Sequence, residues 1–235
     1  MGLISNPDSP FILPSQPMNV NNCYLYVTEL VNKLSSNSGL NIPKAVFVMI
    51  YNAVQNQWVE DSVKMNELNK IRIDEIQQLV VDTPLNATKK TQYYESTLPA
   101  DYYHYVRSYS LVNDCNLDNW LVKEGDVNVL LSDEFWKPSL EWGETICTLG
   151  NNKIKVYYDN FTVKKVNLIY YRYPIEINMA DGYTNTAGVL NTDVDPEFLG
   201  SSIIEILNLT AQTLAGVAGD AERYSVLTNK VQSHT

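Results

Sequence analysis

The chain has 235 residues, of which 45% are hydrophobic and 19% charged, and its net charge is −10 at neutral pH. This length predicts one large domain or two small ones. The negative charge, with basic residues only in short pairs, argues against a general affinity for nucleic acid. Three cysteines far apart in the sequence are expected to be buried free thiols. No apolar run of about 18 residues occurs, so no transmembrane helix is predicted.

The first 20 residues are expected to form an extended arm. Four prolines block helices and sheet ladders there: Pro7, Pro10, Pro14 and Pro17. The segment Phe11-Ile12-Leu13 gives the arm apolar side chains that would dock on its own domain or on a neighbouring subunit. A free tail is the alternative, since termini are often unattached.

Two helical patterns follow the arm. The first places apolar residues at helical spacing over residues 24–34. The second begins at Asn41-Ile42-Pro43, where Asn serves as a cap and Pro lies near the first helical position. Residues 44–83 contain neither Gly nor Pro, and predict either one helix of about 40 residues or two packed helices with a break at 60–62. Pro84 ends the pattern.

The first strand signals lie between Gln92 and Leu111. Leu98-Pro99-Ala100-Asp101 predicts a turn, after which aromatic and β-branched residues alternate with period two. The residues expected to share one face of this strand are Tyr103, Tyr105, Arg107 and Tyr109. Residues 113–126 are polar and are expected to be irregular, with Trp120 and Leu121 covering an edge of the core.

A meander is predicted over residues 144–177. It would consist of strands at 144–149, 153–158 and 161–173, joined by turns at 150–152 and 159–160. Along the last strand, period two places one set of residues together on a single face: Val166, Leu168, Tyr170 and Arg172.

The final part of the chain predicts a loop and a helix. Residues 178–194 have few apolar side chains and are expected to form a flexible loop. Asp195-Pro196-Glu197 has the signature of a helix start, with Asp as the cap. An apolar stripe follows: Ile203, Leu207, Thr210, Leu214, Val217, Ala221, Tyr224 and Val231. Small residues near Gly216 favour close packing against the helix at 43–83.

Together these elements predict an α+β fold, in which a helical bundle from the N-terminal half and the C-terminal helix carries an antiparallel β-rich insertion. The expected organisation is an arm at 1–20, a helical bundle from 21–90 and 195–235, a β-rich insertion at 91–177 and a flexible loop at 178–194.

No enzyme is predicted. The two histidines, His104 and His234, match no metal or triad spacing, and no phosphate-binding loop occurs. Asp101 and Asp195 are explained as turn and cap residues. We therefore assign no catalytic, cofactor-binding or metal-binding residue and no cofactor, although two distant carboxylates of a hydrolase could still converge in the fold.

Four short motifs remain. They are Leu98-Pro99-x-Asp101-Tyr102, Ile169-Tyr170-Tyr171 followed by Pro174, Asp195-Pro196-Glu197-Phe198, and Arg72-Ile73-Asp74-Glu75-Ile76 within the helical stretch 58–79. In their order along residues 40–230, these motifs resemble the ring-forming head-to-tail connector proteins of tailed bacteriophages. The similarity is to the adaptor or tail-tube proteins of short-tailed phages, including the crAss-like group, from which this chain departs by its long 113–143 segment.

The resemblance implies a structural virion protein without catalysis. Identical subunits, expected to number twelve, would form a closed ring between portal and tail, and genomic DNA would leave through its centre without sequence-specific binding. The subunits would assemble in the host cytoplasm, contact the portal and other tail proteins, and have no membrane partner. We expect the 1–20 arm and the 178–194 loop to reach adjacent subunits or the neighbouring ring.

The alternative is a tail or surface binding module. The chain has 16 Tyr against 5 Phe, and Tyr combines an apolar ring with a polar tip. A Tyr-rich strand face would suit stacking on a carbohydrate or contact with a partner protein. The simpler interpretation is that many of these tyrosines are ordinary strand residues.

Overall fold

The computed structural model describes residues 18–33, 39, 41–69, 73–180 and 192–217. The chain divides into two compact units. One, here called the helical unit, contains residues 1–76 and 174–235, and the other, the sheet unit, contains residues 77–173.

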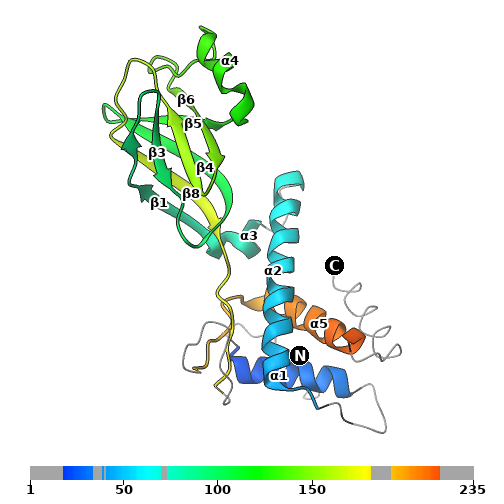
Figure 1. Ribbon diagram of the computed structural model, residues 1–235. Helices are drawn as coiled ribbons and strands as arrows, with labels where there is room; N and C mark the ends of the chain where they lie inside the picture. The colour runs from blue at the N-terminus through cyan, green and yellow to red at the C-terminus, as the bar shows by residue number, and fades with distance from the viewer. Residues whose placement is uncertain (1–17, 34–38, 40, 70–72, 181–191, 218–235) are drawn as a thin grey trace, which may run out of the picture. The chain divides into compact units, whose positions relative to one another are not determined.

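Three long helices form the helical unit: α1 (Val20–Asn32), α2 (Lys44–Asn69) and α5 (Gly200–Val217). A short helix, α3 (Ile73–Ile76), follows α2. Helix α5 contacts both α1 and α2, so the expected packing of the last helix against the earlier one is confirmed (Figure 1). Helix α2 continues through residues 60–62 without a break.

Large apolar side chains from all three helices fill the core of the helical unit. Phe47, Tyr51 and Phe198 are fully buried, and the Phe198 ring meets the Trp58 ring edge-on at 5.1 Å between centroids. The predicted stripe on α5 is buried at its first four positions, but Val217 is exposed. The rest of the stripe, Ala221, Tyr224 and Val231, lies outside the described residues.

The start of the last helix differs from the prediction. Helix α5 begins at Gly200, which has a φ of +61°, and not at Pro196. The Asp195 carboxylate instead accepts a hydrogen bond of 2.8 Å from the backbone N–H of Val20, at the first residue of α1. Glu197 accepts one of 2.7 Å from the N–H of Ile175. Both acids are used by other segments, so they do not cap α5.

The sheet unit contains eight strands. In chain order they are β1 (Val80–Leu85), β2 (Thr88–Lys89), β3 (Tyr93–Thr97), β4 (Tyr102–Val112), β5 (Cys115–Leu121), β6 (Glu144–Gly150), β7 (Lys153–Tyr157) and β8 (Lys165–Arg172). A 3₁₀ turn, η1 (Gln77–Leu79), precedes β1. Their order in the sheet is β1-β8-β4-β5-β6-β7-β3-β2. All pairs are antiparallel except β5 and β6, which run parallel.

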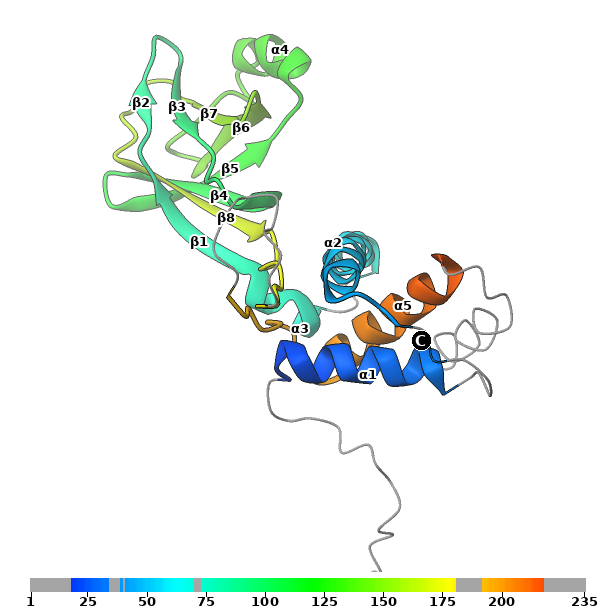
Figure 2. The same ribbon diagram turned by 60° about the horizontal axis from the view of Figure 1, so that its bottom comes forward.

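The sheet curls so strongly that its two edges approach each other. Its edge strands, β1 and β2, are separated in sequence only by Asn86 and Ala87, so the connection holds the edges close together (Figure 2). The curl encloses a core to which most strands contribute: Leu85, Tyr94, Leu98, Val112, Leu117, Cys147, Ile154, Val156, Phe161, Val163, Val166, Leu168 and Tyr170. The concave face of the sheet is therefore filled by its own side chains.

The predicted fold class, a helical bundle with an antiparallel β insertion, is wrong. The chain is mixed α and β, but it is built mainly on a curled, mixed eight-stranded sheet with its own core. The N-terminal half does not remain helical to Thr83, because residues 80–85 pair with β8 as strand β1. Val80 and Val81 are β-branched, and such residues favour a strand once a partner strand is present.

The predicted meander at 144–177 is also wrong. Strands β6 and β7 form a hairpin at the predicted turn of 150–152, and its residues Asn151 and Asn152 have φ of 52° and 57°. The next strand, β8, does not pair with β7 but lies between β1 and β4. The connecting segment contributes buried Phe161 and Val163 to the core as it passes from one part of the sheet to another.

Strand β4 departs from simple alternation. Its pairing with β8 shifts between Tyr102 and His104 and again between Tyr105 and Arg107. These bulges place Tyr105 against the core while Tyr109 lies on the opposite side with Arg107, so the expected common face of Tyr105 and Tyr109 does not form. In β8, by contrast, the predicted face of Val166, Leu168 and Tyr170 is buried as a unit.

The cysteine prediction holds in part. All three thiols are free, and Cys23 and Cys147 are buried, but Cys115 is exposed at the start of β5. Burial raises the pKa of the Cys23 thiol to about 12, and it also raises the pKa of Cys147.

The predicted arm and loop fall mostly outside the described residues. Residues 1–17 and 181–191 are not described. The base of the loop is closed by two backbone hydrogen bonds between Asn178 and Val194, of 3.2 and 2.9 Å.

Candidate binding surface

The connection between the two parallel strands carries the most distinctive surface of the sheet unit. Parallel neighbours cannot be joined by a tight turn, so β5 and β6 need a crossover segment. Residues 122–143 supply it, through a 3₁₀ turn η2 (Glu124–Asp126), helix α4 (Val127–Ser132) and a loop.

A small second core holds the crossover against the sheet. Val127 of α4 packs with Ile146 of β6 and Tyr157 of β7. At the start of the crossover, Lys155 donates a hydrogen bond of 2.6 Å to the Glu124 carboxylate. This bond holds the pKa of Glu124 below its ordinary value. The crossover therefore has fixed points at its start and along one side of α4.

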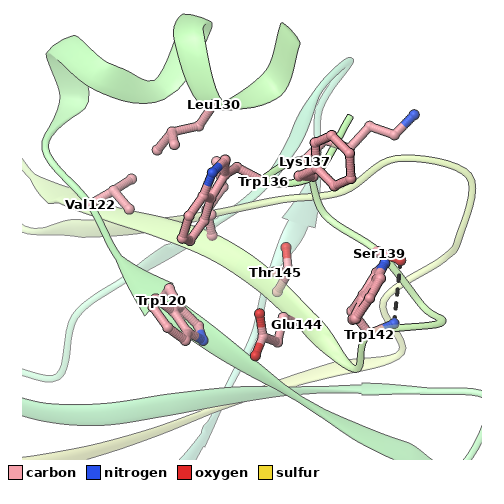
Figure 3. A pocket seen from close by; sticks show the side chains of 11 residues that line it. Trp120, Val122, Leu130, Trp136, Lys137, Ser139, Trp142, Glu144 and Thr145 are labelled. Atoms are coloured by element: carbon pink, nitrogen blue, oxygen red, sulfur yellow. Dashed lines mark hydrogen bonds between the residues drawn. The ribbon is translucent and has the colours of Figure 1, made fainter. Parts of the chain in front are cut away.

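Three of the four tryptophans of the chain line a pocket formed by this crossover and the neighbouring strands. We call it the tryptophan pocket, of about 150 Å³, and it is lined by Trp120, Val122, Leu130, Phe135, Trp136, Lys137, Ser139, Trp142, Glu144, Thr145 and Ile146 (Figure 3). Its aromatic side chains remain largely open to solvent: Trp120 at 50%, Trp136 at 58%, Trp142 at 71% and Phe135 at 84%. A cluster of exposed large apolar side chains on this scale is typical of an interaction site.

Local structure explains why these side chains face outward. Alternation along β5 turns Leu117 and Asn119 inward and leaves Trp120 on the outer face. The ring of Trp136 meets that of Trp120 edge-on, with 6.5 Å between centroids. The expectation that Trp120 and Leu121 cover a core edge is therefore wrong, because both are exposed.

Hydrogen bonds shape the loop that presents the other aromatic rings. The Asp133 carboxylate accepts a bond of 2.8 Å from the N–H of Phe135, and the Asp133 carbonyl accepts one of 3.0 Å from the N–H of Lys137. Ser139 and Glu144 exchange backbone hydrogen bonds, and the N–H of Trp142 donates to the Ser139 hydroxyl at 3.4 Å. Trp136 and Trp142 are thus carried on two successive turns rather than on an unstructured segment.

Polar groups at the pocket are few. The Glu144 carboxylate lies between Trp120 and Trp142 and forms no hydrogen bond or ion pair with the described residues (Figure 3). Lys137 forms an exposed ion pair with Asp159 at 3.8 Å. Aromatic walls with one carboxylate suit the binding of proline rings, aliphatic side chains, sugar rings or a cation.

A buried polar cluster supports the strand beneath the pocket. The Ser110 hydroxyl donates to the Asn119 amide oxygen at 2.8 Å, and the Asn119 amide donates to the Ser108 hydroxyl at 3.0 Å. All three side chains are buried, so these bonds satisfy groups that water cannot reach. They fix β4 and β5 to each other directly behind Trp120.

Several tyrosines of the described residues are buried or partly buried against a core. Tyr94 and Tyr170 belong to the sheet core, Tyr102 and Tyr105 pack against it, and Tyr51 is buried in the helical unit. Burial raises the pKa of both Tyr51 and Tyr105. The most exposed aromatic cluster of the described residues is therefore made of tryptophan and phenylalanine.

Residues from two of the four short motifs contact each other in the sheet unit. Asp101 accepts a hydrogen bond of 2.8 Å from the Tyr170 hydroxyl, and its carbonyl accepts one of 2.9 Å from the N–H of Tyr173. The rings of Tyr102 and Tyr170 lie 5.6 Å apart. These motif residues thus have structural roles where β4 begins and β8 ends, and Asp101 is more than a turn residue.

Among the described residues, no three His, Cys, Asp or Glu side chains gather closely enough to hold a metal ion. No helix of the described part of the chain is both long and apolar enough to cross a membrane. His104 lies within β4, as expected for a strand residue, and His234 lies outside the described residues.

Comparisons with known proteins assign the chain to no family. No protein-family model matches the chain. No curated protein has a similar sequence.

Sequence reasoning missed the tryptophan pocket. Its signal was present, because Trp120, Phe135, Trp136 and Trp142 fall within 23 consecutive residues. Because aromatic residues are enriched at interfaces, such a density indicates aromatic side chains that lie on the surface and contact a partner.

Proposed function

We propose that this protein is a structural virion subunit that assembles with copies of itself into a ring of the phage head-to-tail connector and encloses the DNA exit channel. The observation that carries the proposal is the open aromatic surface of the tryptophan pocket. A monomer that exposes Phe135 and two tryptophans beyond half of their area gains free energy when a partner covers them.

The arrangement of the family motifs supports the same proposal. Asp101 and Tyr170 come from the two strand motifs, and their hydrogen bond joins the start of β4 to the end of β8. Phe198, from the third motif, is buried against Trp58 in the helical unit. The motifs therefore stabilise the scaffold, which is what a ring subunit needs if its binding surfaces are carried by loops.

Electron microscopy of the purified full-length protein tests this proposal. Closed rings of one size, also found between portal and tail in virions, are the expected result. A protein that stays monomeric at high concentration, alone and with the portal, would exclude it. The variant Trp120→Ala/Trp136→Ala should shift the protein toward smaller assemblies, whereas Val106→Ala, which removes exposed apolar surface elsewhere on the sheet unit, should not.

A binding module for carbohydrate is the second candidate. It is favoured by one observation, the unpaired Glu144 carboxylate between two tryptophan rings, since sugars bind through ring stacking and hydroxyl–carboxylate hydrogen bonds. Glycan-array binding that disappears in Trp142→Ala, in a protein that forms no ring, would favour this candidate over the ring subunit.

A further inference from the structure

We infer that the tryptophan pocket binds the proline-rich segment 7–17 of a neighbouring copy of this chain. The inference rests on the proposed ring function and names the partner of the surface described above. It is drawn from the chemistry of the pocket and from the spacing of prolines outside the described residues.

The first observation is the proline spacing. Pro7 and Pro10 are three residues apart, and so are Pro14 and Pro17. A polyproline II helix has three residues per turn, so each pair would lie on one face of such a helix. Proline-rich segments in general favour this conformation before binding, so an occupant of this kind loses little conformational entropy when it binds.

The second observation is the shape and composition of the pocket. Recognition of proline-rich segments uses grooves lined by aromatic side chains, with slots between rings that accept a proline or a neighbouring apolar residue. Trp120 and Trp136 stand edge-to-face at 66°, and Trp142 provides another wall on the other side of Glu144 (Figure 3). The segment Phe11-Ile12-Leu13, between the two proline pairs, supplies additional apolar side chains for this surface.

Charge favours this occupant over most other surfaces of a second copy. The chain carries a net charge of −10, so two copies repel each other in general. Residues 1–17 contain a single charged side chain, Asp8. This segment can therefore approach the pocket, with its own carboxylate Glu144, at a smaller electrostatic cost than the rest of the chain.

Symmetry explains why the arm should come from a neighbour. A ring of identical subunits needs two different surfaces on each chain, one of which binds the other on the next copy. The pocket and the arm are two such surfaces. In a polyproline II conformation, 17 residues would reach about 50 Å, which exceeds the diameter of about 30 Å of a small domain.

A fluorescence titration tests the contact itself. A peptide of residues 5–19 contains neither Trp nor Tyr. The titrated protein carries Trp58→Phe, so that tryptophan emission comes only from the three pocket tryptophans, and also Pro10→Ala, Phe11→Ala and Pro14→Ala, so that the arms of other copies leave the pocket open to the peptide. We expect the peptide to shift this emission to shorter wavelength in a saturable way.

The Trp136→Ala substitution should weaken binding at least about tenfold, as for a central interface tryptophan. A peptide with Pro10→Ala and Pro14→Ala should bind more weakly, and unchanged emission with the native peptide would overturn the inference.

A mixing experiment tests whether the contact joins two copies. One full-length variant carries Pro10→Ala, Phe11→Ala and Pro14→Ala in the arm, and another carries Trp120→Ala and Trp136→Ala in the pocket. Each alone should fail to associate through this contact, whereas the mixture should form dimers of one copy of each, because each retains the half that the other lacks. Absence of mixed dimers, with peptide binding intact, would overturn the assignment of the arm to a neighbouring copy.

These outcomes separate the inference from the proposed function. If the arm variant forms rings as well as the native protein does, while the pocket variant does not, the arm contact is excluded and the ring function stands. If the native protein forms no ring but its pocket still binds the peptide, the ring function fails and the pocket–arm contact stands.

Discussion

The Tyr170 hydroxyl donates a hydrogen bond of 2.8 Å to the Asp101 carboxylate, and so connects the start of β4 to the end of β8. Tyr170 itself is almost completely buried in the sheet core, whereas Asp101 is exposed. The backbone carbonyl of Asp101 also accepts from the N–H of Tyr173. Asp101 thus binds the end of β8 through both its side chain and its backbone.

Removal of this bond should weaken the sheet unit measurably. Tyr170→Phe keeps the buried ring but removes the hydroxyl. Because the exposed Asp101 carboxylate can then form a hydrogen bond with water, the free energy of unfolding should fall by only about 1 kcal/mol. Urea denaturation followed by circular dichroism measures it. Tyr173→Phe, in which the altered side chain is exposed, serves as the control. An unchanged midpoint for Tyr170→Phe would show that the bond contributes nothing.

The same pair predicts a pH dependence. Burial, together with the hydrogen bond to Asp101, raises the pKa of Tyr170 to about 12 from its ordinary value near 10. Because the folded state binds this proton more tightly than the unfolded state, the contribution is complete below pH 10 and is lost as the pH rises toward 12. The difference in denaturation midpoint between the native protein and Tyr170→Phe should therefore decrease over this interval. A constant difference would contradict the prediction.

The polar cluster behind the pocket should be costly to break. Asn119→Ala leaves the buried Ser110 hydroxyl without its partner, whereas the Ser108 hydroxyl keeps the Tyr105 hydroxyl as a partner at 3.1 Å. An unsatisfied buried group costs about 1–3 kcal/mol. Asn116→Ala, on the exposed face of the same strand, should change stability by less than about 0.5 kcal/mol. Chemical denaturation of both variants gives the comparison, and equal effects would show that the buried bonds have no special role.

The Phe198 ring should be important to the helical unit. It is fully buried and contacts Trp58, so Phe198→Ala should destabilise the protein by about 3–5 kcal/mol. Leu199→Ala removes an exposed side chain from the next position and should have little effect. Thermal denaturation measures both, and a small effect of Phe198→Ala would contradict the structural role given to this motif.

An additional prediction concerns the first helix. Asp195→Asn keeps an oxygen that can accept from the N–H of Val20 but removes the negative charge from the N-terminus of α1, so its effect should be smaller than that of Asp195→Ala. We expect a loss of about 1 kcal/mol for the alanine variant. If both substitutions reduced the unfolding midpoint equally, the charge rather than the hydrogen bond would be decisive.

Local features of the chain were determined by the sequence itself. The alternation of β8 buried Val166, Leu168 and Tyr170 as expected, and Asn151-Asn152 adopted the left-handed turn that these residue types favour. These outcomes depend on neighbouring residues and on backbone preferences, which the sequence carries directly. The helical spacing of α1 and the buried positions of α5 follow for the same reason.

The tertiary structure alone decided which strands pair and which aromatic side chains remain exposed. Residues 80–85 form a strand because they pair with β8. Tyr105 faces the core because the pairing of β4 with β8 contains bulges. The parallel pairing of β5 with β6 required a crossover, and that crossover presents Trp136 and Trp142. Such outcomes come from contacts between segments distant in sequence, whose free energies local patterns do not contain.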